Sequence, residues 1–112
     1  MLTARPVLDA LGDPTRRLII ERLRQRPMAV GDLANGLPVS RPAVSQHLRV
    51  LKTAGLVRDR VQGTRRIYSL DPSGLTSLRG YVESLWDGVL AEFKSAAEVG
   101  QPASAGKEID HE

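Results

Sequence analysis

Apolar residues recur every three or four positions along most of this chain, and this repeat predicts a mainly helical fold. A first short helix is expected over residues 4–11, ended by Gly12. A second helix is expected to follow at once, because Asp13 is a good N-cap and Pro14 suits the first helical position. Its buried stripe is expected to consist of Leu18, Ile19 and Leu23.

Two further helices are predicted close together in the sequence. The first spans residues 30–36 and turns its apolar residues inward, namely Val30, Leu33, Ala34 and Leu37. The second spans residues 41–54 within "SRPAVSQHLRVLKTAGLV", where Ser40 is the N-cap and Gly55 supplies the left-handed stop. Val44, Leu48 and Leu51 fall at i, i+4 and i+7, so they share the buried face.

The pattern then changes to that of strands. Val57, Val61, Ile67 and Tyr68 flank a Gln62-Gly63-Thr64 turn, which predicts a β-hairpin. A long last helix is expected over about residues 72–98, with apolar positions spaced like a coiled-coil seam. We therefore predict one mainly α domain with a small β-hairpin over residues 1–98. Residues 99–112 are small, polar and acidic, and are expected to form a disordered tail.

Charge is unevenly distributed along the chain. Residues 41–66 contain six arginines and Lys52 against Asp59 alone, whereas residues 67–112 contain three basic and eight acidic residues. A basic middle segment predicts contact with a polyanion that is confined to that segment. Of the 16 basic residues 13 are arginine, which favours bidentate contacts to phosphates and base edges.

The absence of some residue types excludes several classes of function. The chain has no cysteine, which excludes disulfides, thiol catalysis and thiolate metal sites. The chain shows no glycine-rich phosphate loop and no evident catalytic cluster, so an enzyme is not expected. The longest aliphatic string, Leu18-Ile19-Ile20, is too short to span a bilayer, and a soluble cytoplasmic protein without a membrane partner is expected.

The helices over 30–36 and 41–54, with the hairpin after them, predict a helix-turn-helix followed by a wing. In such motifs the N-terminal half of the second helix reads base edges in the major groove. Arg41 and Arg49 can reach phosphate or guanine, and Gln46 can pair with adenine. The candidate DNA-binding residues are Ser40, Arg41, Pro42, Ser45, Gln46 and Arg49 on the helix, and Arg60, Gly63, Arg65 and Arg66 in the hairpin.

Four arginines cluster around the predicted hairpin turn, at positions 58, 60, 65 and 66. Their mutual repulsion is expected to be relieved by an anion, such as the phosphates of a DNA backbone. Arg60, Arg65 and Arg66 are the favoured DNA contacts, whereas Arg58 is expected to pair with Asp59 or to lie over the sheet. His47 has two interpretations, a half-buried histidine hydrogen-bonded locally or a phosphate contact.

Three stretches, "LGDPTRRLIIERL", "VGDLANGLPVSRPAVSQHLRVLKTAGLV" and "RVQGTRRIYSLD", resemble the ArsR/SmtB family of bacterial winged-helix repressors across about residues 5–98. The resemblance implies a homodimer, built mainly by the first and last helices, that binds a pseudo-palindromic operator in or near its own promoter. The expected dimer residues are Leu8, Leu11, Leu78, Val82, Leu85, Trp86, Val89 and Phe93.

The metal-sensing half of the family description is not expected to apply here. Metal-sensing relatives place cysteines where this chain has Ala29 and Gly31, and residues 72–98 contain no histidine. The last helix resembles a metal-independent branch, so neither a metal nor another cofactor is expected. Two alternatives remain open: a regulator that responds to a small apolar molecule near Trp86 and Phe93, and a winged-helix module that binds protein only.

Overall fold

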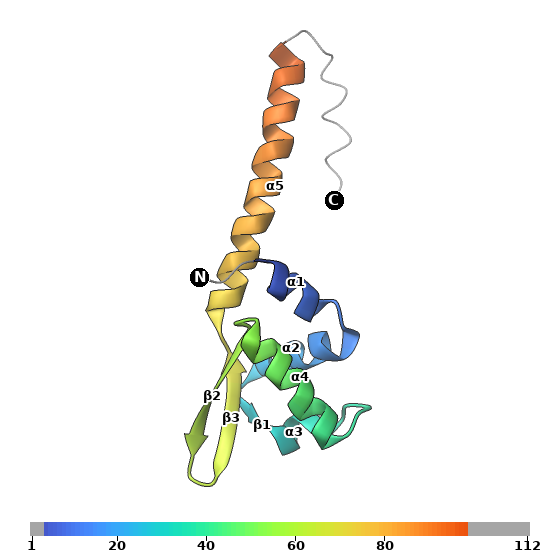
Figure 1. Cartoon of the computed structure of the whole chain (residues 1–112), viewed down its shortest axis with the longest axis vertical. Coiled ribbons are helices and arrows are strands. Elements are labelled where there is room, and N and C mark those ends of the chain that lie inside the picture. Colours follow the sequence, from blue (N-terminus) through green and yellow to red (C-terminus); the bar gives the residue numbers. More distant parts are fainter. Residues whose placement is uncertain (1–3, 99–112) are drawn as a thin grey trace. The chain divides into compact units, whose positions relative to one another are not determined.

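The computed structural model describes residues 4–98, which form five helices and a three-stranded sheet (Figure 1). The chain divides into two units, the first ending at Arg79 and the second beginning at Gly80. In order, the elements are α1 (Ala4–Leu11), α2 (Pro14–Gln25), β1 (Met28–Ala29), α3 (Val30–Ala34), α4 (Arg41–Thr53), β2 (Val57–Gln62), β3 (Arg65–Leu70) and α5 (Pro72–Glu98). The predicted mainly helical fold with a wing is confirmed, and the predicted tail over 99–112 lies outside the described residues.

Short polar side chains determine where α2 and α4 begin. The Asp13 carboxylate accepts the backbone N–H groups of Thr15 at 2.8 Å and Arg16 at 3.2 Å. Ser40 Oγ accepts the N–H of Ala43 at 3.3 Å. Because the first N–H groups of a helix have no intrahelical acceptor, these bonds fix the first turn. The two N-caps predicted from the sequence are therefore confirmed.

The core of the first unit is aliphatic. Its largest fully buried side chains include Ile19, Leu33, Leu48, Leu51 and Leu56, which come from α2, α3, α4 and the turn that follows α4. The three residues predicted to face the core from α4 are all buried, which confirms that part of the prediction.

The predicted stripe of α2 was wrong at one position. Leu18 is 46% exposed, whereas Ile19 and Leu23 are buried and Ile20 packs against the core. A residue next to Ile19 is rotated by about 100° around the helix, and Leu18 is about 140° from Leu23. Leu18 therefore falls outside the arc that the core covers.

The sheet has the strand order β1-β3-β2, and both pairings are antiparallel. The hairpin of β2 and β3 was predicted, but Gln62, which was predicted to lie in the turn, is the last residue of β2 and pairs with Arg65, so only Gly63 and Thr64 form the turn. Gly63 has a φ of +65°, a conformation that glycine adopts without strain. Strand β1 was not predicted, because a two-residue strand, Met28 opposite Tyr68 and Ala29 opposite Ile67, is too short to show alternation.

The start of α5 packs directly on the turn that follows α4. The Gly74 N–H donates to the Gly55 carbonyl at 2.8 Å, and Gly74 is buried. A Cβ at position 74 would lie only 2.7 Å from that carbonyl oxygen. This close backbone approach fixes the first turn of α5 on the first unit. No helix within residues 4–98 is long and apolar enough to span a membrane.

Candidate nucleic-acid interface

Helix α4 lies in the first unit (Figure 1), and the side that is turned away from the core carries exposed polar residues. Val44, Leu48 and Leu51 anchor its opposite side in the core. Since these residues fix the rotation of the helix about its axis, the predicted base-reading residues are left exposed to solvent. The exposed residues are Arg41, Pro42, Ser45, Gln46 and Arg49.

Two of these side chains are bonded to each other. Arg49 Nη1 donates to Gln46 Oε1 at 2.9 Å across one helical turn. An amide oxygen has two lone pairs and the amide nitrogen two donors, so Gln46 can keep this bond and still contact adenine N6 and N7. The bond therefore orients the Gln46 amide in advance of contact with a base.

The Arg41 side chain extends from the first turn of α4 to α3. Its guanidinium lies over Gly31 of α3, and a Cβ at that glycine would be 3.5 Å from Arg41 Cζ. Ala29 and Gly31 supply no side chain that can bind a metal. Among residues 4–98 there is also no group of three or more histidine, aspartate or glutamate side chains close enough to hold an ion.

Two of the four hairpin arginines have carboxylate partners within the chain, whereas an external anion was expected to relieve their repulsion. Arg65 Nη2 lies 2.9 Å from Asp32 Oδ2 of α3, and the two side chains are 58% and 45% exposed. Arg66 Nη1 lies 2.8 Å from Asp59 Oδ2. These two pairs neutralise part of the positive charge of the hairpin before any DNA is present.

The expected pairing of Arg58 with Asp59 is not found. Asp59 is instead bonded to Lys52 of α4, at 2.9 Å from Nζ, as well as to Arg66 of β3. Side chains of adjacent strand residues point to opposite faces of a sheet, which separates Arg58 from Asp59. The hydrogen bonds from Lys52 and then Arg66 hold the pKa of Asp59 below its ordinary value.

His47 takes part in a small polar cluster at the other side of α4. Its Nδ1 lies 3.4 Å from Arg16 Nη1, and because a guanidinium can only donate, Nδ1 is the acceptor. Arg16 Nε also donates to the Ala10 carbonyl at 2.6 Å. His47 is therefore half-buried as predicted, but its partner is a residue of α2 rather than a local group.

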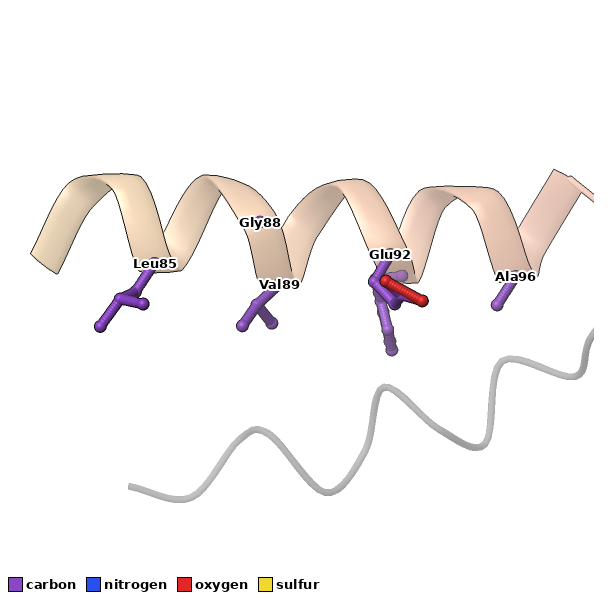
Figure 2. A pocket seen from close by; sticks show the side chains of 6 residues that line it. Leu85, Gly88, Val89, Glu92 and Ala96 are labelled. Atoms are coloured by element: carbon purple, nitrogen blue, oxygen red, sulfur yellow. The ribbon is translucent and has the colours of Figure 1, made fainter.

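The predicted dimer residues fall into two groups. Leu11 and Leu78 pack against the core of the first unit, whereas Leu8 of α1 is 42% exposed. In the second unit an apolar face of α5 is exposed, and Figure 2 shows the side chains of Leu85, Val89 and Ala96 pointing to the same side of the helix. Val82, Leu85, Trp86 and Val89 are each about half exposed, and Phe93 lines the same face.

Several of these features were missed by sequence reasoning. Lys52, Asp59 and Asp32 were not singled out as parts of the surface, and neither was the link from Arg16 to His47. Asp32 and Arg65 are 33 residues apart, so no local periodicity reports their pairing. The one sequence feature that could have indicated these ion pairs was the single acidic residue Asp59 within the strongly basic segment 41–66.

Residues 13–59 match a family model described as "Bacterial regulatory protein, arsR family". The chain is 61% identical over 85 residues to the HTH-type transcriptional regulator Rv2034 of Mycobacterium tuberculosis (strain ATCC 25618 / H37Rv), covering 76% of this chain and 79% of the relative. It is 39% identical over 69 residues to the transcriptional repressor SdpR of Bacillus subtilis (strain 168), covering 62% and 77%.

Solved structures share the fold. The ArsR-like transcriptional regulator from Rhodococcus sp. RHA1 superposes with a TM-score of 0.76 at 27% sequence identity. The match covers 86% of this chain and 91% of that protein, so it includes both the helix-turn-helix and the hairpin elements of the first unit.

Proposed function

The chain belongs to the arsR family of bacterial regulatory proteins, and from this premise we propose that it is a homodimeric repressor that binds a pseudo-palindromic operator in or near its own promoter. It is a DNA-binding transcriptional regulator and not an enzyme. The observation that carries the finer proposal is the exposed polar face of α4, held in place by a buried opposite face. Residues 1–98 are the proposed DNA-binding and dimerisation domain.

We assign the base-reading role to the N-terminal half of α4. An α-helix fits the major groove, where Arg41 and Arg49 contact guanine or phosphate and Gln46 contacts adenine. Ser45 donates to a base or phosphate, and Pro42 packs on a thymine methyl group. Ser40 supports these contacts by capping the helix.

The hairpin supplies the backbone contacts. Arg60, Arg65 and Arg66 extend from β2 and β3 toward the phosphates or the minor groove beside the bound helix. Gly63 carries no side chain, and nothing lies within 4 Å of the Cβ position at this turn, so the backbone there can approach DNA closely. Arg65 exchanges its exposed partner Asp32 for a phosphate in this step, whereas Arg66 contacts the phosphate through guanidinium nitrogens other than Nη1, which stays bonded to Asp59.

The homodimer follows from the apolar residues that stay exposed. Val82, Leu85, Trp86 and Val89 form a large apolar face on α5, and soluble monomers rarely expose such a face. A second copy of the chain is its proposed partner, with Phe93 and Leu8 contributing. Leu11 and Leu78 support the same helices from the core side. A symmetric dimer presents two copies of α4, which matches a pseudo-palindromic site.

The proposed regulator acts in the cytoplasm, without a metal-sensing site. Ala29 and Gly31 replace the ligands that the metal-sensing type needs, and the guanidinium of Arg41 covers the position. The acidic residues of α5 lack the imidazole or thiolate partners that give transition-metal sites most of their affinity.

The direct test is binding to the DNA upstream of the protein's own gene, followed by fluorescence anisotropy. With six to ten phosphate contacts per dimer, affinity is expected to fall by about 10³–10⁵ between 50 and 200 mM salt. The substitution Arg49→Ala is expected to cost roughly 1–3 kcal/mol of operator affinity, which is a ten- to hundredfold loss. Operator affinity that is independent of salt would refute the proposal.

The matched control is Arg24→Ala, which removes the same charge from α2. Arg24 is exposed, pairs with Glu21 at 3.1 Å and is not among the proposed DNA contacts. It is expected to leave operator affinity within about twofold, since removing one distant surface charge costs little. If the chain were a module that binds protein only, Arg49→Ala and Arg24→Ala would both leave its function unchanged.

A further inference from the structure

Asp59 is a carboxylate placed inside the positively charged surface proposed to contact DNA. Its side chain is only 8% exposed, and both of its oxygens bond to cationic groups, Lys52 and Arg66. A negative charge at this place repels phosphates and weakens DNA binding in general. Its presence therefore points to a role other than attracting DNA.

The bonds of Asp59 join three elements of the first unit. Lys52 lies in the last turn of α4, Asp59 on β2 and Arg66 on β3. Together with Ser45 and Arg49, they line a crevice of about 380 Å³ between α4 and the hairpin. The bridge thus crosses from the base-reading helix to the wing.

The bridge also lies where the hairpin leaves the body of the unit. Val57 is buried and the Asp59 side chain is largely shielded, whereas residues 60–62, which follow it along β2, are exposed. Asp59 is thus the last residue of β2 with a substantial buried contact to a helix. Beyond this point β3 pairs with β2 and, at Ile67, with Ala29 of β1, and the exposed Asp32–Arg65 pair joins the hairpin to α3.

We infer that Asp59 is a positioning residue that determines operator specificity, because its bridge fixes the distance between the base-reading face of α4 and the wing arginines. The inference rests on the proposed function of that surface. Phosphate contacts determine which base pairs lie opposite the base-reading helix. A wing held at a fixed distance from α4 therefore limits the positions along the DNA at which helix and wing can bind together. A loosened wing still attracts any DNA but no longer selects one register.

The Asp59 carboxylate is ionised, which keeps its bonds to Lys52 and Arg66 in place at neutral pH. The hydrogen bonds from Lys52 and Arg66 lower the pKa of Asp59, so the group stays ionised at neutral pH. The carboxylate is shielded from solvent, whereas the Lys52 and Arg66 side chains are 55% and 54% exposed, so salt still screens part of each pair.

Asp32 provides a matched control for Asp59. It also pairs with a wing arginine, Arg65, at 2.9 Å, but its side chain is 45% exposed. Asp59→Asn and Asp32→Asn each remove one negative charge and release one wing arginine, and Asp59→Asn also releases Lys52. If charge alone matters, both variants bind DNA more tightly. If position matters, only Asp59→Asn loses specificity.

The experiment measures the affinity of wild type and both variants for the upstream fragment and for a scrambled fragment of equal length. Asp59→Asn is expected to lose about tenfold in affinity for the upstream fragment, which corresponds to one charged hydrogen bond, and none for the scrambled one. Asp32→Asn is expected to bind both fragments as well as wild type or better. Upstream affinity that is unchanged or raised in Asp59→Asn overturns the inference.

A second variant covers the case in which Asp59→Asn does not fold. Lys52→Met breaks only the α4 side of the bridge and leaves Asp59 bonded to Arg66. It is expected to reduce the preference for the upstream fragment over the scrambled one. An equal loss on both fragments would show a mere charge effect and would overturn the inference. In a folded double variant the two effects are expected to be non-additive, because they break the same link.

Hydrogen exchange separates this inference from the proposed function. In the DNA-free protein, the amides of residues 60–66 are expected to exchange faster in Asp59→Asn than in wild type, with Asp32→Asn close to wild type. If wild type shows no preference for the upstream fragment, the proposed function fails, and this readout still decides whether Asp59 positions the wing. Unchanged exchange in Asp59→Asn would overturn the positioning role on its own.

Discussion

Asp13, Ser40 and Asp71 each precede a helix, and each accepts backbone N–H groups of the following turn. In Asp71 the acceptor of the Ser73 N–H is Oδ1, at 2.9 Å. Such bonds lie within three residues of sequence, so a short polar residue before an apolar repeat predicts them reliably. The helix starts were predictable from the sequence for this reason.

The charge on Asp13 yields a pH-dependent prediction. The N–H groups of Arg16 and Thr15 lower its pKa in the folded protein below the ordinary 3.8. Its ionised form therefore stabilises the fold above that ordinary pKa, and this stabilisation is lost as the pH falls through the lower folded-state value. We expect Asp13→Asn, which keeps a cap but no charge, to melt at a lower temperature than wild type at pH 7.

Thermal melts across the acid range provide the measurement. The gap between wild type and Asp13→Asn is expected to shrink as the pH drops below about 3.8 and to disappear once the carboxylate is protonated. A gap that stays constant with pH would show that the charge contributes nothing.

At the scale of elements, local signals and long-range contacts differ in how well they could be predicted. The hairpin of β2 and β3 was predicted, because alternation and a Gly63 turn are both short-range patterns. Strand β1 was not, since its two residues acquire strand structure only through pairing with Ile67 and Tyr68. The partner of Arg65 was likewise unpredictable, because folding alone brings Asp32 of α3 next to β3.

The contact between the start of α5 and the turn after α4 leads to a second prediction. At Gly74, a Cβ would stand 2.7 Å from the Gly55 oxygen and 2.9 Å from its carbonyl carbon. Backbone atoms cannot move aside as a flexible side chain would, so Gly74→Ala is expected to cost about 1–3 kcal/mol of folding stability. Chemical denaturation measures this cost.

Gly80→Ala in the same helix is the control. Nothing lies within 4 Å of its Cβ position, and alanine has a better helix propensity than glycine. This variant is expected to gain about 0.5–1 kcal/mol. Equal effects at positions 74 and 80 would rule out the close approach as the cause.

At the scale of the whole molecule, the basic DNA surface and the apolar face of α5 have separate roles. The first is the proposed contact with phosphates and bases, and the second is the proposed contact with another copy of the chain. Binding two half-sites at once raises affinity by about 10²–10⁴ over a single half-site, because the second contact becomes intramolecular. Operator affinity should therefore depend on residues of α5 that contact no DNA.

Val89→Glu tests this dependence. A carboxylate at this exposed apolar position would be buried without a partner in the dimer, so we expect a monomer in light scattering. Operator affinity is expected to fall by about 10² or more, with helical content preserved. Ala91→Glu, at an exposed position on the opposite side of α5, is expected to remain dimeric and to bind the operator normally. A dimeric Val89→Glu protein would contradict the proposed interface.

The arrangement β1-β3-β2 leaves β2 with a free flank, since β3 pairs with it on one side only within the described sheet. An edge strand of this kind has unpaired backbone N–H and C=O groups that can pair with a strand of another molecule, and charged side chains such as lysine or arginine disfavour that pairing. Val61, 64% exposed, is bracketed on β2 by Arg60 and Gln62. The hairpin arginines proposed to contact DNA are therefore also expected to limit aggregation, so neutralising them to weaken DNA binding is expected to lower solubility as well.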